Sequence, residues 1–188
     1  MNFIQIGTHL ADDNFYDIIK NNKDNITKLI LVEANPNCIE TIEEKYSFIN
    51  NKTIINKAVV SDDRTTINLY IPINDSTSQQ ISESKDHVLA HGHSSVTNIN
   101  INAINVNTLL DSFEGSIDLF CIDTEGYDIP IINSINFEKF DIKTIIFEYI
   151  HSDGIRSNGG PKLEECKKLL TRFGYTFSFE EYNIIAKK

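Results

Sequence analysis

The feature that most constrains the fold is the stretch from residue 117 to residue 130, which reads IDLFCIDTEGYDIP. An apolar run of this kind, ended abruptly by polar residues, is typical of a strand buried on both faces of a parallel sheet. Two carboxylates, Asp123 and Glu125, follow the strand, and Gly126 then leads into a predicted helix. Ligands of open α/β sheets bind outside the carboxyl ends of the strands. We therefore expect Asp123 and Glu125 to line a pocket.

The remaining sequence alternates between strand and helix patterns. Strands are predicted over residues 3–6, 28–32, 53–60, 65–71, 99–106, 117–122 and 143–147, and helices over 14–19, 39–49, 109–113, 127–134 and 161–173. A hairpin is predicted over 174–177 and 184–186. This alternation indicates a doubly wound, mostly parallel α/β sheet with a C-terminal antiparallel hairpin. We expect residues 1–188 to form a single domain, because 188 residues with 40% hydrophobic content can bury one full core.

Charge and cysteine content argue against several classes of protein. A net charge of −10, with only three arginines, disfavours a nucleic-acid-binding surface, which requires a basic patch. The three cysteines lie far apart and form no CxxC pair, which favours a reducing, cytoplasmic compartment. No basic segment leads into a long apolar one, so we expect neither a signal peptide nor a membrane span.

The ends of the first two strands indicate a cofactor site. The first strand is followed by Gly7 and Thr8, and a nucleotide-like cofactor approaches the backbone at this turn in sheets of this type. Glu33 follows Gly7 by 26 residues, close to the spacing of roughly 20 at which an acid binds a ribose hydroxyl in dinucleotide-binding folds. A complete GxGxxG motif is missing, which argues against NAD. The alternative is a tight turn and a solvated carboxylate without a ligand.

Three acids at the ends of the later strands each have a functional and a structural interpretation. Asp123 and Glu125 could bind a divalent cation through their oxygens, or one of them could act as a general base toward a bound hydroxyl. The structural alternative is capping of the helix that follows them. Glu148 ends the strand at 143–147 and is expected at the same edge of the sheet. Its structural alternative is a carboxylate whose hydrogen bonds come from the backbone.

Residues 72–98 are rich in Ser, Asn, Asp, Gln and His and lack apolar periodicity, which predicts a long loop that could include a helical turn. The segment His91-Gly92-His93 is too short to identify a metal site. A flexible polar lid that carries His87, His91 and His93 is the preferred interpretation, and metal binding by these histidines is the alternative. Together with residues 149–160, this loop is expected to form the pocket for an acceptor substrate.

Taken in order, several segments resemble the FkbM-type family of S-adenosylmethionine-dependent methyltransferases. The matching segments are 3–8, 31–36, 56–62, 94–96, 106–110, 117–130, 137–140 and 145–148. The most specific of them carries the family's Ile-Asp-x-Glu-Gly at residues 122–126. One departure is Ala11, which stands where the family usually has a second glycine.

The resemblance implies a Rossmann-like class I methyltransferase fold with a mostly parallel seven-stranded sheet and helices on both faces. It also implies S-adenosylmethionine as the methyl donor. By position, Gly7 and Thr8 would lie near the methionine part of this cofactor, and Glu33 would bind the ribose hydroxyls. Ala58 would lie by the adenine, and Asp123 near the methyl group.

The sequence therefore predicts an O-methyltransferase that methylates a hydroxyl of a sugar, glycan or glycosylated metabolite. Its candidate catalytic residues are Asp123, Glu125 and Glu148. The hydroxyl proton would be removed by Asp123, Glu125 or a loop histidine, or a divalent cation held by the acids could instead acidify a sugar diol. The expected partner is a small-molecule or glycan acceptor, not a nucleic acid or a membrane. Two alternatives stay open: a non-catalytic binding module or partner subunit with the same fold, and a cation-dependent hydrolase that uses the three acids.

Overall fold

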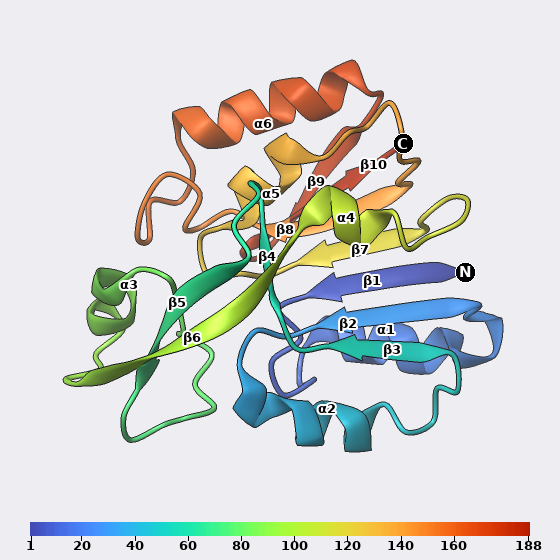
Figure 1. Ribbon diagram of the computed structural model, residues 1–188. Helices are drawn as coiled ribbons and strands as arrows, with labels where there is room; N and C mark the ends of the chain where they lie inside the picture. The colour runs from blue at the N-terminus through green and yellow to red at the C-terminus, as the bar shows by residue number, and fades with distance from the viewer.

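The computed structural model describes residues 1–188, and a seven-stranded sheet forms its centre (Figure 1). From edge to edge the strands are β3 (Lys52–Ile55), β2 (Lys28–Val32), β1 (Asn2–Ile6), β7 (Leu119–Ile122), β8 (Thr144–Glu148), β10 (Asn183–Lys187) and β9 (Thr176–Glu180). Neighbouring strands are parallel from β3 to β8, whereas β10 is antiparallel to both β8 and β9. The predicted parallel sheet with a C-terminal hairpin is confirmed. The chain reverses its direction of winding between β1 and β7, and such a switch point is where ligands of these sheets bind.

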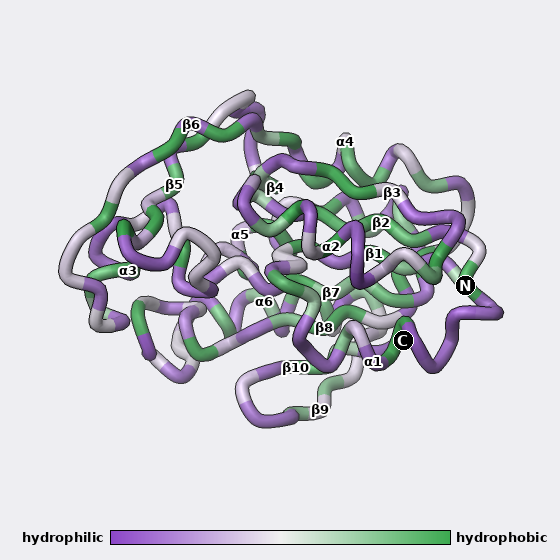
Figure 2. Tube along the Cα trace, turned by 90° about the horizontal axis from the view of Figure 1, so that it is seen from below, coloured by the Kyte–Doolittle hydropathy of each residue, from purple (hydrophilic) through white to green (hydrophobic).

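Helices cover both faces of this sheet because apolar side chains on its central strands point alternately to the two sides. One core joins Phe3, Leu29 and Leu31 to α1 (Asn14–Asn22) and α2 (Ile39–Lys45). The other core, with Ile4, Ile30 and Phe120 at its centre, is covered by α4 (Val106–Leu110), α5 (Asp128–Ser134) and α6 (Pro161–Arg172). Two short 3₁₀ helices, η1 (Lys23–Asn25) and η2 (Pro36–Cys38), lie in the connections. In Figure 2 the green, hydrophobic segments accordingly run through the strands in the middle of the molecule.

The helix boundaries follow from ordinary capping rules. Asp13 caps α1 by accepting a hydrogen bond from the Tyr16 amide. Pro161 occupies the first turn of α6, where its missing N–H has no intrahelical partner to lose. None of the helices combines the length and the apolar composition that crossing a membrane would need.

A second sheet of three strands extends from the first. It consists of β4 (Ala58–Val60), β6 (Val96–Asn105) and β5 (Thr66–Pro72), with β4 parallel and β5 antiparallel to β6. The β5–β6 hairpin projects away from the main sheet in both Figure 1 and Figure 2. The α3 helix (Lys85–Ala90) packs against this hairpin, so the predicted loop at 72–98 does include a helical turn.

The prediction of one strand over residues 53–60 is wrong. The chain bends at Asn56 and Lys57, and the segments on either side belong to different sheets. The Asn56 side-chain amide donates to the carbonyl oxygens of Glu33 and Ala34 at 2.8 and 3.1 Å, which anchors the bend beside the end of β2. The bend turns Ala58 away from the main sheet and toward its carboxyl edge, where the site lies.

Candidate active site

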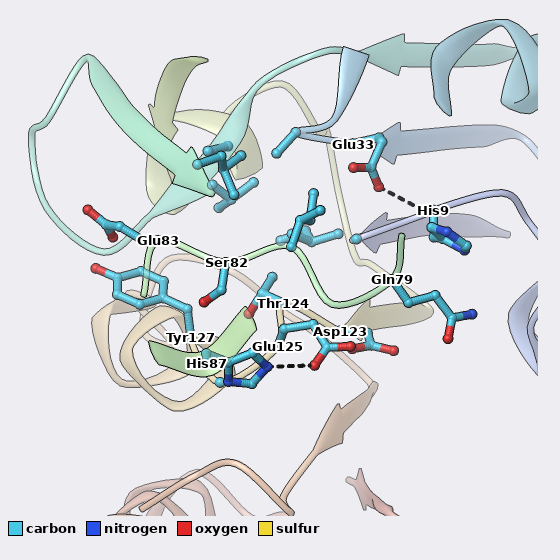
Figure 3. A pocket seen from close by; sticks show the side chains of 18 of the residues that line it. His9, Glu33, Gln79, Ser82, Glu83, His87, Asp123, Thr124, Glu125 and Tyr127 are labelled. Carbon is cyan, nitrogen blue, oxygen red and sulfur yellow. Dashed lines mark hydrogen bonds and ion pairs between the residues drawn. The ribbon is translucent and has the colours of Figure 1, made fainter. Parts of the chain in front are cut away.

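A cavity of about 540 Å³ opens at the carboxyl ends of β1, β2 and β7, beside the switch point. Its sheet side is formed by residues that follow these three strands, and its opposite side by β4, β5 and the segment 78–87. Figure 3 shows that Glu33 and Asp123, from strands on either side of β1, both border this space. The predicted convergence of strand-end acids therefore holds for these two residues.

Gly7 lies at the floor of the cavity and allows the ends of β1 and β7 to approach closely. Its φ is +79°, and a Cβ built on it would lie 1.6 Å from the Asp123 carbonyl oxygen. No other residue fits this position, because the neighbouring strand occupies the space that a side chain would need. Thr8 is fully buried, and its hydroxyl donates to the Val32 carbonyl oxygen at 3.4 Å. The Thr8 side chain does not line the cavity.

Glu33 is held rigidly at the end of β2. Its two carboxylate oxygens accept hydrogen bonds from the His9 and Asn35 amides, each at 2.7 Å, and only 4% of its surface is exposed (Figure 3). Burial raises the pKa of Glu33, and the two amide hydrogen bonds partly offset this rise. Each oxygen of a carboxylate has two lone pairs, so Glu33 can still accept hydrogen bonds from a vicinal diol.

Part of the cavity lining is apolar. Ala58, which the resemblance puts by the adenine, lines the cavity together with Val32, Ala34, Val59, Ile67 and Leu69. A surface of this kind suits a flat, weakly polar ring, because it removes apolar area from water without leaving polar groups unpaired.

Asp123 and Glu125 lie on the loop between β7 and α5. Asp123 lines the cavity and is exposed there. The protein packed around its carboxylate nevertheless raises the pKa of Asp123 well above its usual value, and the negative charges of Asp128 and Glu125 raise it further. Glu125 has a left-handed backbone, with φ at +53°, and its Oε2 lies 3.1 Å from His87 Nε2 (Figure 3).

Asp128, which the sequence analysis did not single out, organises this loop. One of its oxygens accepts hydrogen bonds from the Thr124 hydroxyl and amide at 2.8 and 3.2 Å. Its other oxygen is buried and has no hydrogen-bond partner, and burial raises the pKa of Asp128 to about 7. The separation of Thr124 and Asp128 by four residues could have indicated this contact from the sequence, because side chains at such spacings can hydrogen-bond across one turn.

Glu148 occupies a different position from the other acids. It is the last residue of β8 and pairs in register with Asn183 of β10, and it does not line the cavity. One of its oxygens is buried without a partner, and burial together with the charge of Asp123 raises the pKa of Glu148 to about 9. Glu148 therefore lies near the other acids without bordering the cavity, and its catalytic role stays a prediction.

Two histidines line the cavity, one from each of the two segments that were expected to form the acceptor pocket. His87, from α3, and His151, from the loop after β8, both line the cavity beside Glu125. Burial lowers the pKa of His151, and the neighbouring His87 lowers it further. His93, by contrast, lies 3.3 Å from Gln80 Oε1 and takes no part in this group.

Comparison with known proteins places the chain in a family. The family model for the methyltransferase FkbM domain matches residues 5–177. The FkbM methyltransferase of Methylobacillus flagellatus KT superposes with a TM-score of 0.59 at 12% identity, covering 100% of this chain and 43% of that structure. The fibrillarin pre-rRNA processing protein of Methanococcus jannaschii gives a TM-score of 0.50 at 9% identity, covering 98% of this chain and 64% of that one. No curated protein matches the sequence.

These identities are low, so the structural likeness establishes the fold, which is the class I methyltransferase-like α/β fold. The chain spans less than half of the length of the Methylobacillus structure that it matches. The family model matches most of this chain, from within β1 to within β9, and the matched range includes every strand-end acid discussed above. The chain belongs to the FkbM family of S-adenosylmethionine-dependent methyltransferase domains.

Proposed function

We propose that this chain binds S-adenosylmethionine in the cavity and methylates a hydroxyl group of a sugar, glycan or glycosylated metabolite. The observation that carries this proposal is the convergence of Glu33, Ala58 and Asp123 on one cavity at the switch point. A cavity of about 540 Å³ is within the usual range for small-molecule sites, roughly 300–1,000 Å³.

The residues present fit the cofactor. Glu33 would accept hydrogen bonds from the ribose hydroxyls with its remaining lone pairs, and the apolar wall around Ala58 would lie by the adenine. Gly7 would lie near the methionine part. When bound, S-adenosylmethionine supplies a transferable methyl group on a positively charged sulfur, and nearby carboxylates favour a cation electrostatically.

Asp123 is the residue best placed to accept the proton of the acceptor hydroxyl, because its carboxylate is accessible from the cavity. Glu125 is engaged by His87 at 3.1 Å and would instead hold that histidine in place. Holding the hydroxyl beside its proton acceptor in the correct orientation supplies a large part of the rate enhancement in such reactions.

The hairpin side of the cavity supports a sugar-like acceptor. Hydroxyl and amide side chains line it at Ser78, Gln79, Ser82 and Ser84. Groups of this kind both donate and accept hydrogen bonds, which matches the alternating needs of sugar hydroxyls. They come from the segment 72–98 that the sequence analysis expected to contact the acceptor.

Calorimetry with S-adenosylmethionine tests the cofactor site. We expect Glu33→Ala to weaken binding roughly 10- to 100-fold, because hydrogen bonds to a charged group contribute about 1.5–3 kcal/mol. Glu43→Ala, on the exposed side of α2 and outside the cavity, is the matched control and should bind normally. The absence of binding at millimolar cofactor, or undiminished binding by Glu33→Ala, would refute the proposal.

Transfer of a labelled methyl group to a panel of glycans tests the reaction. We expect the label on a hydroxyl oxygen, and Asp123→Asn should reduce transfer while cofactor binding persists. Label on nitrogen or carbon would contradict O-methylation. Cofactor binding without transfer to any member of a broad panel would favour the non-catalytic binding module.

A further inference from the structure

Four side chains that can ligate metals converge beside the cavity, and three of them line it. They are His87, His91, Glu125 and His151, and one ligand atom from each lies within 4.8 Å of the other three. They come from three separate segments: α3 and its C-cap, the loop after β7, and the loop after β8. The methyl-transfer proposal uses none of the three histidines as a chemical group, so their convergence needs a separate explanation.

His87 and His91 are four residues apart on and just after α3, which places both rings on one face. Their ring centroids are 4.5 Å apart. Nδ1 of His91 lies 2.9 Å from the His87 carbonyl oxygen. Because a carbonyl oxygen can only accept, His91 Nδ1 must carry the proton, and Nε2 keeps a free lone pair. A backbone contact of this kind fixes the tautomer and orientation of metal-bound histidines.

Glu125 supplies the oxygen at the centre of the group. Its Oε2 lies 3.1 Å from His87 Nε2 and 3.9 Å from His151 Nε2. A tetrahedral zinc ion with ligands at about 2.0–2.1 Å holds neighbouring ligand atoms roughly 3.3 Å apart, so the group is close to the required size. Glu125 also has a left-handed φ of +53°, a strained conformation that clusters at functional sites when the residue is not glycine.

His87 Nε2 carries a proton in this arrangement, because the Glu125 carboxylate 3.1 Å away can only accept, and this proton must leave before Nε2 binds a metal. His151 has a further constraint. Its Nδ1 accepts a hydrogen bond from the Arg156 amide at 3.0 Å, so in this arrangement the proton of the neutral ring is on Nε2. Coordination through Nε2 would move that proton to Nδ1 and break the bond to Arg156. Binding by His151 therefore requires the backbone near Arg156 to shift, and its net contribution to affinity is smaller.

We propose that His87, His91 and Glu125 bind a divalent transition-metal ion of the zinc type, with His151 as a weaker fourth ligand. Imidazole nitrogens suit zinc and its neighbours in the transition series, whereas magnesium and calcium prefer oxygen ligands. The site differs from the oxygen-only cation site that the sequence suggested at Asp123, Glu125 and Glu148, with which it shares only Glu125. The ion would join α3 and the hairpin to the main sheet. The proposal concerns ion binding alone and does not depend on methyl transfer.

Titration of the chelator-stripped full chain with zinc chloride tests the site. We expect one equivalent to bind, and His87→Ala to lower the affinity by about a hundredfold or more, beyond the 10- to 100-fold typical of lost supporting contacts. His151→Ala should lower it about tenfold or less, because the bond to Arg156 no longer has to be broken. His93→Ala is the matched control, since His93 belongs to the same segment and lies outside the group, and it should bind as the wild type does.

Two measurements on the wild type keep the proposal testable if a variant fails to fold. Zinc, but not magnesium, should raise the melting temperature, because an ion that binds only the folded chain stabilises it. X-ray absorption of the zinc-loaded protein should show at least two imidazole ligands. Fewer than two, or an equal loss of affinity in His93→Ala and His87→Ala, would overturn the proposal. Cofactor binding measured in the presence of chelator separates this outcome from the fate of the methyltransferase proposal.

Discussion

The two sides of the cavity are built by different kinds of interaction. On the sheet side, backbone hydrogen bonds join neighbouring strands right up to the site: the Gly7 amide donates to Val32 and the Asp123 amide to Ile6, both at 2.9 Å. These bonds continue the ladders of a sheet whose larger core contains 27 buried residues. Neither residue can move without breaking the ladder.

On the hairpin side, contacts from side chains to the backbone hold the wall against the sheet. His9 Nε2 donates to the Thr77 carbonyl oxygen at 2.6 Å, and the Asn35 side-chain amide donates to the Ser76 carbonyl oxygen at 2.7 Å. The core under the second sheet contains only three buried residues. Regions with few buried apolar contacts open at lower free energy than a central sheet. The sheet side of the cavity is therefore a fixed side, which suits binding of the cofactor. The hairpin side is an adjustable side, which suits a variable acceptor.

The largest expected effect is on the fixed side, from Gly7→Ala. A methyl group there would lie 1.6 Å from the Asp123 carbonyl oxygen, and the positive φ adds strain. Because both atoms belong to rigid strand ends, we expect a loss of at least about 4 kcal/mol of unfolding free energy, measured by urea denaturation.

Gly92→Ala is the matched control on the adjustable side. Gly92 also has a positive φ, +91°, but a Cβ there would meet nothing within 4 Å. Its cost should be limited to backbone strain, about 1–2 kcal/mol. Similar losses for the two variants would mean that the close approach at Gly7 is not rigid, and the contrast between the two sides would fail.

The main sheet could be predicted from the sequence because each strand carries its own signal. Buried strands such as 28–32 and 117–122 read as short apolar runs that end in turn residues, and this pattern depends only on local composition. The break at residues 56–57 could not be predicted in the same way. It depends on hydrogen bonds from Asn56 to carbonyl oxygens 23 and 22 residues earlier, which no local pattern reveals.

The same distinction applies to the site. Asp123 and Glu33 directly follow parallel strands, so the sheet geometry alone brings them together. The histidine group was missed because it joins α3 to a loop about 60 residues later, and only the packing of the hairpin against the sheet creates it. The spacing of His87 and His91 by four residues was a usable signal, because it places both rings on one face of a helix.

We expect Glu148→Gln, at the end of β8 in the main sheet, to have an intermediate effect on the free energy of unfolding. Burial raises the pKa of Glu148 from its ordinary 4.5 to about 9, so the folded chain keeps this proton where the unfolded chain loses it. The unfolded state then binds fewer protons, and wild-type stability falls as pH rises from about 4.5 to about 9. Glutamine carries no charge at any pH, so burying it does not become more costly as pH rises. The variant should therefore be more stable than the wild type by about 2 kcal/mol at pH 8 and nearly equal to it at pH 5.

Glu83→Gln provides the comparison on the hairpin side. Glu83 forms an exposed ion pair with Arg64, and such pairs contribute less than about 1 kcal/mol. The free energies of unfolding of this variant and the wild type should therefore differ little at both pH 5 and pH 8. Unfolding curves that show the same pH-dependent gain for both variants would indicate a general charge effect and not the burial of Glu148.

The smallest expected effect lies at the boundary between the two sides, in Asn56→Ala. This change removes two hydrogen bonds, at 2.8 and 3.1 Å, that hold the bend between β3 and β4 beside Glu33. Because Asn56 is exposed and water can replace part of what is lost, the cost should be about 1 kcal/mol. Cofactor affinity should fall less than in Glu33→Ala, since the bend positions Ala58 and leaves the Glu33 carboxylate in place.

Asn100→Ala is the control. It removes longer contacts of 3.3 and 3.4 Å within the hairpin and should change neither the unfolding free energy nor the cofactor affinity appreciably. If the two asparagine variants behave alike, the bend is fixed by the backbone, and the rigid side of the cavity then extends as far as Ala58.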